Sequence, residues 1–425
     1  MKYNSAKLLC FAGSLIFGAS NTLEAQDTLH ITLSQAEQKL SEKNLSLLAQ
    51  KYNIDIARAN VLQAKLYHNP NISLTGAVYN HTNNKIFDVG NQGEYAINIQ
   101  QLLMLAGKRN KQIKLVETST TMSENSFYDL LRTLKYSLRS TFYQVYYLQQ
   151  SVRSYQVEID SLQRLTTAYE TLQEKGVVTL KDAVRIKSLF YSLKADQSTL
   201  QNSINDLEAD MQILLQSNGT YFFPDAGDRE SLTENIKKLN LQQLTDTAYA
   251  NRYDLKLSAN DILYSQQNYT YQKALAVPDL TVGASFDKNG SYINNANFLT
   301  VAMDLPFFNR NQGNIKAAKI TIDQSQIAFK QEQQTVQNDV YRAYSKLLNS
   351  NKLLESIDTS FQNKFEKLLG GVTENFEKKN ISLIDFTDFY ESYKDNIVQF
   401  NNLQNDRMQA LESLGFAIGK PLFTN

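Results

Sequence analysis

The sequence predicts a mainly α-helical membrane protein made of two copies of one unit, in which a helix, two strands, a very long helix and a further helix follow one another. Three observations predict this fold class. Landmarks of the first half recur in the second half at a nearly constant offset, four short segments alternate between apolar and polar residues, and only 5 prolines interrupt the 425 residues. Because a long sequence period reports a repeated structural unit, each element is expected twice.

Three matched landmarks define the repeat. Pro278 follows Pro70 by 208 residues, and each stands before an alternating segment. The segment EKGVVTLKDAV is matched by EKKNISLIDFT, and EYAINIQQLLMLAGKRNKQI by NFLTVAMDLPFFNRNQGNI. We therefore expect a first repeat at 26–216, a linker at 217–239, where turn-forming residues gather, and a second repeat at 240–425.

The first 25 residues, 1–25, are expected to be a secretory signal peptide. A basic start, MKYNSAK, precedes the apolar run LLCFAGSLIFGAS, and the small residue Ala25 stands before a glutamine. An apolar run of this length is too short to cross a bilayer as a helix. Cys10, the only cysteine, lies inside this segment, so the mature chain would contain no cysteine and would need no disulfide.

The charge balance and the scattered histidines exclude several function classes. Lys and Arg number 43 and so do Asp and Glu, which argues against nucleic acid as a general electrostatic partner. His30, His68 and His81 have no cysteine partners, so neither a metal site nor another cofactor is expected. We find no nucleophile elbow, phosphate-binding glycine loop or paired-carboxylate signature, and so expect no catalytic residues and no enzyme activity.

Four strands are expected, at 71–80, 94–103, 279–287 and 297–305. In each of them apolar residues alternate with small or polar ones, at a length of ~9 to 10 residues that suits a tilted bilayer-spanning strand. A half-buried sheet in a soluble domain gives the same alternation. Four strands cannot close a barrel and open edges are not tolerated in lipid, so a membrane version requires several copies of the chain to share one β-barrel.

The helices are expected at 32–67, 107–173, 179–216, 240–275, 312–377 and 382–416. An apolar ladder from Leu131 to Leu172 advances by about 3.4 residues per step, closer to a coiled-coil repeat than to the ~3.6 of a free helix. At ~1.5 Å per residue the helix at 107–173 would be ~100 Å long. Such a helix needs neighbours along its whole length and water on its other side.

The segment after the last strand is interpreted as a membrane boundary. Pro306 ends the strand where its missing N–H matters least, and Phe307 and Phe308 suit the lipid–water interface. The polar run up to Gly313 then turns the chain into an aqueous helix. Gly107, in the corner after the second strand, is expected to do the same in the first repeat.

The whole mature chain, 29–422, resembles the TolC outer-membrane efflux family. The resemblance rests on the signal peptide, the duplicated order of elements, HNP before the first strand, LPFFNRNQGNI after the last strand and the paired ISLIDF-type helix starts. It is closer to the metal-efflux branch that includes CusC and CzcC. It implies that three protomers build one barrel of 12 strands in the outer membrane of a Gram-negative bacterium, with a long α-helical barrel across the periplasm. The partners that it implies are a periplasmic adaptor and an inner-membrane pump of the RND type.

The resemblance also assigns a pore constriction. Asp385 and Asp388 match two aspartates, one turn apart, that face the pore at the periplasmic end, and Asp182 is expected to contribute. In a trimer each position would become a ring of carboxylates that attracts cations. Thr179 with Asp182, and Ser382 with Asp385, also have the spacing of a capping box, which is a purely structural alternative. For Asp388 the alternative is a solvated helix face.

The turns at the helix tips are expected to contact the adaptor. Gly176 and Asn380 are expected to take the left-handed conformation that commonly ends a helix, although the family usually has glycine at the place of Lys379. The expected contact residues are Gly176, Val177, Thr179, Lys379, Asn380 and Ser382.

Two functions remain in competition on the sequence alone. The leading one is passive export through an outer-membrane channel that an adaptor opens and a pump energises. The alternative is a periplasmic or surface coiled-coil protein with a structural or adhesive role, whose strands belong to a soluble sheet. They differ in whether Leu299, Val301 and Met303 face lipid.

Overall fold

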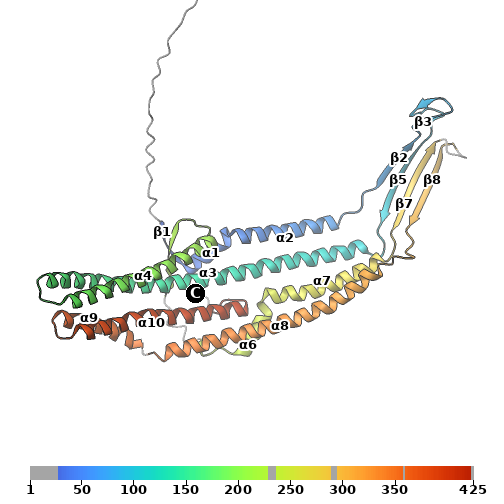
Figure 1. Cartoon of the computed structure of the whole chain (residues 1–425). Helices are drawn as coiled ribbons and strands as arrows, with labels where there is room; N and C mark the ends of the chain where they lie inside the picture. Colours follow the sequence, from blue (N-terminus) through green and yellow to red (C-terminus); the bar gives the residue numbers. More distant parts are fainter. Residues whose placement is uncertain (1–26, 228–235, 289–293, 358, 423–425) are drawn as a thin grey trace, which may run out of the picture.

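The computed structural model describes residues 27–227, 236–288, 294–357 and 359–422 as an elongated molecule, with a sheet at one end and helical tips at the other (Figure 1). The expected signal peptide lies outside the described residues, as do parts of the expected linker and of the loop before the last strand. Within the described ranges, no helix combines the length and the apolar character that crossing a membrane requires.

Each repeat starts and ends near the middle of the molecule, and its helices run toward the sheet on one side and toward the tip on the other (Figure 1). The first repeat contains β1 (Asp27–Thr32), α1 (Leu33–Lys43), α2 (Leu45–Ala64), β2 (Asn71–Gly76), β3 (Tyr79–Asn80), β4 (Lys85–Ile86), β5 (Tyr95–Leu103), α3 (Lys108–Glu174) and α4 (Leu180–Leu215). After β6 (Thr220–Asp225), the second repeat contains α6 (Leu241–Asn251), α7 (Tyr253–Leu275), β7 (Leu280–Lys288), β8 (Ala296–Met303), α8 (Gln312–Glu355), α9 (Thr359–Glu377) and α10 (Leu383–Ile418).

The two repeats end in the same way. Gln216 after α4 and Gly419 after α10 are 203 positions apart, and both take the left-handed conformation, with φ of 51° and 79°. The residue after each donates its backbone N–H to a carbonyl five residues earlier, at 3.1 Å in both repeats. This is a Schellman-type helix end, so the halves share a local cap as well as an order of elements.

The expected helix at 32–67 is divided at Asn44. This residue is extended, with φ of −64° and ψ of 122°, and its side-chain oxygen accepts the N–H groups of Ser46 and Leu47 at the start of α2. Its amide group donates to the Leu214 carbonyl on α4 at 3.1 Å. One buried asparagine thus ends α1, caps α2 and ties both to α4, a long-range contact that periodicity does not reveal.

The expected helices at 240–275 and 312–377 are also divided. The first break lies at a residue with long-range ion pairs, and the second at a residue that hydrogen-bonds to the last turn before it. Arg252, between α6 and α7, is buried and forms ion pairs with Asp254 and Asp339. The expected helix at 312–377 ends its first part at Ser356, whose hydroxyl donates to the Leu353 carbonyl at 2.6 Å. Local hydrogen bonding by serine competes with helix continuation.

Two expectations about strands were wrong in detail. The strand expected at 71–80 ends at Gly76, because the chain then leaves β5 and pairs Tyr79 with Ile86 in the separate β3–β4 hairpin. The expected linker contains β6, which pairs in parallel with β1. Phe222 of β6 is fully buried, so β6 belongs to the core of the molecule.

The sheet, the helices next to it and the helices of the tips each form a layer four elements wide. The sheet has the order β2-β5-β7-β8. Next to it the helices pack in the order α2, α3, α7 and α8, and toward the tips α4 packs on α3, α3 on α10, and α10 on α8 and α9 (Figure 1). The long helix α3 and the α8–α9 pair each pass through both helical levels.

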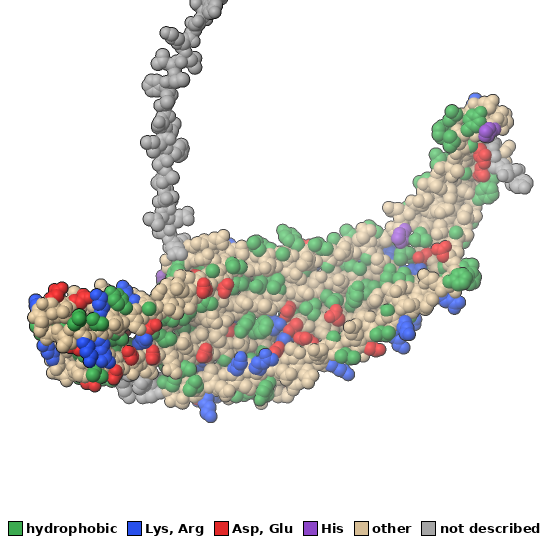
Figure 2. Space-filling model, in the orientation of Figure 1, with side chains coloured by type: hydrophobic (Ala, Val, Ile, Leu, Met, Phe, Trp, Pro, Cys, Tyr) green, Lys and Arg blue, Asp and Glu red, His purple; other side chains and the backbone are tan. Residues whose placement is uncertain are grey.

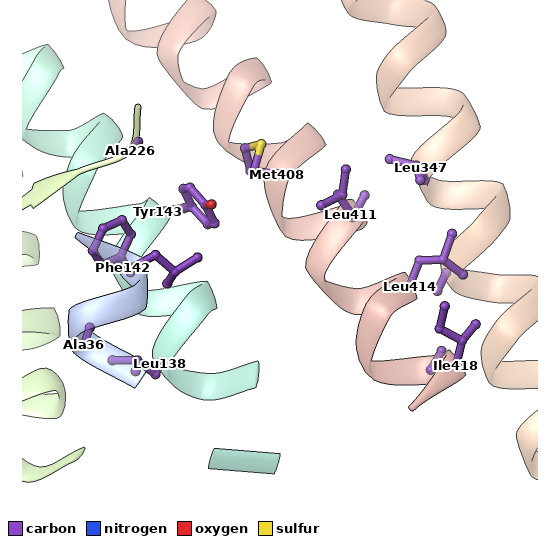
Figure 3. Close-up of a cluster of buried hydrophobic side chains, with 14 of the residues drawn as sticks. Ala36, Leu138, Phe142, Tyr143, Ala226, Leu347, Met408, Leu411, Leu414 and Ile418 are labelled. Carbon is purple, nitrogen blue, oxygen red and sulfur yellow. The ribbon is translucent and has the colours of Figure 1, made fainter. Parts of the chain in front are cut away.

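Two apolar cores hold this layer together. The first lies where α1, α3, α8 and α10 meet, and Figure 3 shows Leu138 and Phe142 of α3 in the same cluster as Met408 and Leu414 of α10 and Leu347 of α8. The second lies in the tips, between α3, α4, α9 and α10. The sheet end has no comparable core among the described residues.

Candidate membrane-facing sheet and pore constriction

The four-stranded sheet has one apolar and one largely polar face. Residues paired directly across strands point to the same face, and the register pairs Ile72 with Ile99, Ile99 with Ala284, and Ala284 with Leu299. The apolar positions of all four strands therefore share one face. The opposite face carries Ser73, Asn98, Gln100, Ser285, Thr300 and, toward the outer end, Phe298.

The apolar face is uncovered. Leu74 is 73% exposed and Leu299 is 82% exposed, and no helix of the described chain packs extensively on the sheet. Tyr95 lies beside Phe286 at the outer end of this face, and the strongly exposed Phe307 and Phe308 follow β8 at the inner end of the sheet. An apolar band between two aromatic belts is typical of strands that face lipid.

The corner of the first repeat is tied to the start of β7. Gly107 caps α3 with a left-handed φ of 66°. The Nζ atom of Lys108, almost fully buried, lies 2.7 Å from Oδ1 of Asp279, and the N–H of Leu105 donates to the same oxygen. The corner is thus a fixed joint between sheet and helices.

The corner of the second repeat turns at Asn311, inside the polar run that ends at Gly313. Asn311 takes the left-handed conformation, with φ of 57°, and its amide group donates to the backbone and side-chain oxygens of Gln272. Gly313 lies inside the first turn of α8 with open space around it. Pro306 lies outside the sheet, so its missing N–H removes no ladder bond. Asparagine replaces glycine at the turn because its side chain can bond locally.

The two tip turns have the same hydrogen-bond pattern. Gly176 and Lys379 are left-handed, with φ of 70° and 60°, and the N–H groups of Val177 and Asn380 donate to carbonyls five residues earlier. The expectation that Asn380 would be the left-handed residue was wrong. This helix end requires the left-handed residue at the first position beyond the cap, and Asn380, one position later, bonds through its side chain to Asn375 at 3.0 Å.

Hydroxyl caps begin both helices after the tips. The Thr179 hydroxyl accepts the Asp182 N–H, and the Ser382 hydroxyl accepts the Asp385 N–H, both at 3.1 Å. In a full capping box the Asp385 side chain would accept the backbone N–H of Ser382. Here Oδ2 of Asp385 instead accepts the Ser382 hydroxyl at 2.7 Å. The caps therefore place both carboxylates at the very start of their helices.

The three predicted constriction aspartates all lie at the tip end of the molecule. Asp385 and Asp388 are exposed and three positions apart on α10, so they share one side of the helix. Asp182 is half-buried on α4, where burial and its negative charge raise the pKa of Tyr169. In the described part of the chain, none of the three aspartates has a Lys or Arg partner within ion-pair distance.

Sequence reasoning missed the contact that joins the two tip hairpins. Tyr169 stacks on Phe376 and Phe376 on Phe386, with ring centroids 5.6 and 4.3 Å apart. Beyond this stack, the Tyr390 hydroxyl donates to the backbone carbonyl and the carboxylate of Glu158 on α3. Burial raises the pKa of Glu158, while the bond from Tyr390 opposes the shift. The available signal in the sequence was Glu158 itself, a charged residue that stands beside Ile159 of the apolar ladder and is buried with it.

The histidines lie apart from each other and from the tips. His30 is in β1, His68 precedes β2, and His81 packs against Tyr79 in the β3–β4 turn. Over the described ranges there is no group of three or more His, Cys, Asp or Glu side chains placed to hold a metal ion.

Known proteins share both the sequence pattern and the fold of this chain. The sequence pattern of a family described as "Outer membrane efflux protein" matches residues 36–215 and 244–420. The chain belongs to the outer membrane efflux protein family. The cobalt-zinc-cadmium resistance protein CzcC of Cupriavidus metallidurans is 18% identical over 394 residues, 92% of this chain and 90% of CzcC.

Solved structures share the fold. The outer membrane channel CmeC of Campylobacter jejuni superposes with a TM-score of 0.75 at 12% identity, covering 91% of this chain and 85% of that one. CusC superposes with a TM-score of 0.71 at 16% identity, covering 91% and 92%. The predicted resemblance to the TolC-like efflux family and its CusC and CzcC branch is confirmed.

The protein is therefore the outer-membrane channel component of a tripartite efflux system. It lies in the Gram-negative outer membrane and extends into the periplasm. Channels of this family are trimers that work with an adaptor and an inner-membrane pump.

Proposed function

We propose that three copies of this chain close into one passive duct through the outer membrane and the periplasm. The observation that carries the proposal is the layer four elements wide, which leaves β2 and β8 as unpaired sheet edges. Unpaired strand edges are not tolerated in lipid. Pairing β2 of one copy with β8 of the next repeats one head-to-tail contact around a ring, and three copies supply a barrel of 12 strands.

The helical edges support the same closure. On α2, at one edge, Tyr52, Ile56 and Leu62 are all more than half exposed. On α8, at the other edge, Ile320 and Ile327 are exposed to a similar degree. Apolar rows along both edges of one layer are expected to bury each other when copies join.

We propose that Asp385 and Asp388, with a contribution from Asp182, form the constriction at the periplasmic end. Asp385 and Asp388 are exposed, and among the described residues none of the three aspartates has a cationic partner within ion-pair distance, which leaves the carboxylates available to a lumen. Three copies would place at least six carboxylates close to one axis, which attracts cations and repels anions. A divalent cation bound there would block the duct.

The tip turns are the proposed docking site of the adaptor. Val177 and Leu180 on the first tip and Ile384 on the second are each more than half exposed, and they flank the predicted contacts Gly176, Thr179, Lys379, Asn380 and Ser382. An apolar surface on two rigid turns suits a partner that docks end to end. The pump that energises transport through this adaptor is proposed to be of the RND type.

The likeness to CzcC suggests the first cargo to test. That protein is described as conferring resistance to cobalt, zinc and cadmium, so we propose divalent metal cations as candidates for export through this duct. Choice of cargo is expected to rest with the pump and the adaptor.

Conductance across a planar bilayer tests the duct and the constriction together. The purified protein is expected to give small, cation-selective steps that a titrated divalent cation suppresses. The double variant Asp385→Ala with Asp388→Ala should conduct more and be blocked less. Asp206→Ala, which removes an exposed carboxylate on α4 away from the tips, is the matched control and should behave as the wild type.

The possible outcomes separate the claims. Unchanged conductance and block in the double variant would remove these aspartates from the constriction while leaving the duct. A protein that never conducts would remove the duct itself.

A further inference from the structure

The β3–β4 hairpin extends the protein beyond its membrane-facing sheet. It follows β2, the strand at the free edge, and lies at the far end of the molecule from the tips (Figure 1). Tyr79 pairs with Ile86, and the Phe87 N–H donates to the Val78 carbonyl at 3.0 Å. The hairpin is thus a small structured unit above the outer aromatic belt.

Asp88 fixes the shape of this hairpin. Its carboxylate accepts bonds from the side-chain amides of Asn80 and Asn83 and from the Gly90 N–H. These bonds, led by the one from Asn83, lower the pKa of Asp88, so it stays ionised. A Cβ atom at Gly93 would lie 1.8 Å from the Asp88 carbonyl oxygen, so the loop closes tightly over its own backbone. The hairpin is therefore pre-organised.

The fixed hairpin presents apolar side chains to solvent. Val78, Ile86, Phe87 and Val89 are 63–74% exposed, and Tyr79 is 43% exposed. Phe87 also takes the left-handed conformation, with φ of 50°, which is costly for a bulky side chain. Figure 2 shows hydrophobic side chains gathered at this end of the molecule. Exposed apolar side chains gathered on a fixed hairpin mark an interaction site.

Lipid is a poor partner for this surface. The hairpin lies beyond Tyr95 and Phe286, the aromatic belt that ends the apolar face of the sheet. Anionic head groups attract clustered Lys and Arg side chains, but between 77 and 93 the chain has one lysine, Lys85, and no arginine. A largely uncharged protein surface fits better.

We propose that the β3–β4 hairpin docks through Val78, Ile86, Phe87 and Val89 onto a neighbouring copy of this chain and ties the trimer together at its outer rim. The inference rests on the proposed function, because it requires β2 of one copy to meet β8 of the next. The hairpin continues directly from that edge strand, so closing the ring brings a second copy beside it. Lys288 of β7 donates to the Gly90 carbonyl at 2.8 Å, which links the hairpin to its own second repeat.

Site-specific photo-crosslinking identifies the occupant. p-Benzoylphenylalanine is placed at position 87, and outer membranes containing the full chain are irradiated. We expect a covalent dimer of this chain on a denaturing gel, confirmed by mass. The same residue at position 82, an exposed turn position outside the apolar set, is the control and should give no dimer. A second probe at position 89 guards against a local fault at 87.

Each outcome decides the matter. Adducts only with lipid or lipopolysaccharide, adducts with another protein, or no adduct above the control at both positions would overturn the docking of hairpin to copy. The same samples are tested for channel conductance. Conducting channels without the dimer would overturn the hairpin inference alone, whereas neither oligomer nor conductance would overturn the proposed function and this inference with it.

Discussion

Removing one hydroxyl at Tyr390 tests whether α10 is held to α3 by the contact with Glu158. The two side chains are 1% and 7% exposed, and the hydroxyl donates to two oxygens of Glu158. Tyr390→Phe keeps the ring against Phe386 but leaves the buried carboxyl without its donor. Leaving a buried polar group without a partner costs about 1–3 kcal/mol. The contact between the tip hairpins should weaken by that amount.

Native-state hydrogen exchange of the α10 amides measures this loss locally. A loss of about 2 kcal/mol corresponds to roughly 30-fold faster exchange, since about 1.4 kcal/mol is a factor of ten. Glu158→Gln is the matched control, because the amide oxygen still accepts the Tyr390 hydroxyl, and below pH 4.5, where Glu158 is protonated, its exchange should stay close to wild type. Exchange in Tyr390→Phe within a factor of two of wild type would show that this contact does not hold the hairpins together.

The same contact should make the tips sensitive to pH. The pKa of Glu158 is raised by burial in the folded protein, so the folded state binds its proton more tightly than the unfolded state. The stabilisation of the folded state by this proton is complete below 4.5, the pKa of Glu158 in the unfolded chain, and is lost as pH rises through the pKa of Glu158 in the folded protein. Protection of α10, corrected for intrinsic exchange, should fall as pH rises, and Glu158→Gln should flatten the slope. An equal slope in both proteins would refute the linkage.

The remaining predictions concern the second tip, the sheet and the middle of the protein. Lys379→Gly should stabilise the second tip turn by about 0.5–1 kcal/mol, because glycine adopts the left-handed conformation without strain. Gly176→Ala should destabilise the first tip turn for the same reason. Hydrogen exchange at the turn should become slower in Lys379→Gly and faster in Gly176→Ala. Leu299→Lys should cost about 2–4 kcal/mol if this residue faces the middle of the bilayer, while Thr300→Lys on the opposite face should be tolerated, and equal yields of assembled trimer would contradict the assignment of faces. Burial raises the pKa of Glu208 to about 7, although the hydrogen bond from the Phe222 N–H opposes this shift. Protonated Glu208 therefore stabilises the folded protein fully below pH 4.5, and this contribution is lost as pH rises through about 7. In thermal unfolding, Glu208→Gln should stabilise the protein by about 1–3 kcal/mol at pH 8 and by little at pH 4.

Periodic patterns predicted the parts of the fold that repeat locally. β5, β7 and β8 begin and end within two residues of the expected strands, and α3 differs from its expected range by one residue at each end. These elements are regular because alternation and the 3.4-residue ladder act over many consecutive positions. Thr179 and Ser382 were found as caps because a cap depends only on the next few residues.

The misplaced elements depended on contacts between distant residues. Asn44 divides a helix because its amide reaches Leu214, and Arg252 divides another because it pairs with Asp339. β6 was assigned to a linker because its partner, β1, lies about 190 positions earlier. No local pattern reports such partners.

The constriction was predicted through resemblance to the family rather than through its chemistry. Asp385 and Asp388 look like any exposed carboxylates at a helix start, and their proposed role exists only when three copies place them around one axis. Glu158 and Tyr390 were not singled out, because a buried carboxyl and its donor 232 positions away become a pair only in the folded protein.

The sequence by itself determined the duplication, the two-faced strands, the long helices and the caps at the tips, since each is written in residues that are neighbours along the chain. The tertiary structure decided which strands pair, where helices break, which residue takes the left-handed conformation at each turn, and how the tip hairpins are joined. Those features follow from contacts across the layer, such as Lys108 with Asp279, whose free energy depends on burial and distance. Neither quantity exists until the chain has folded.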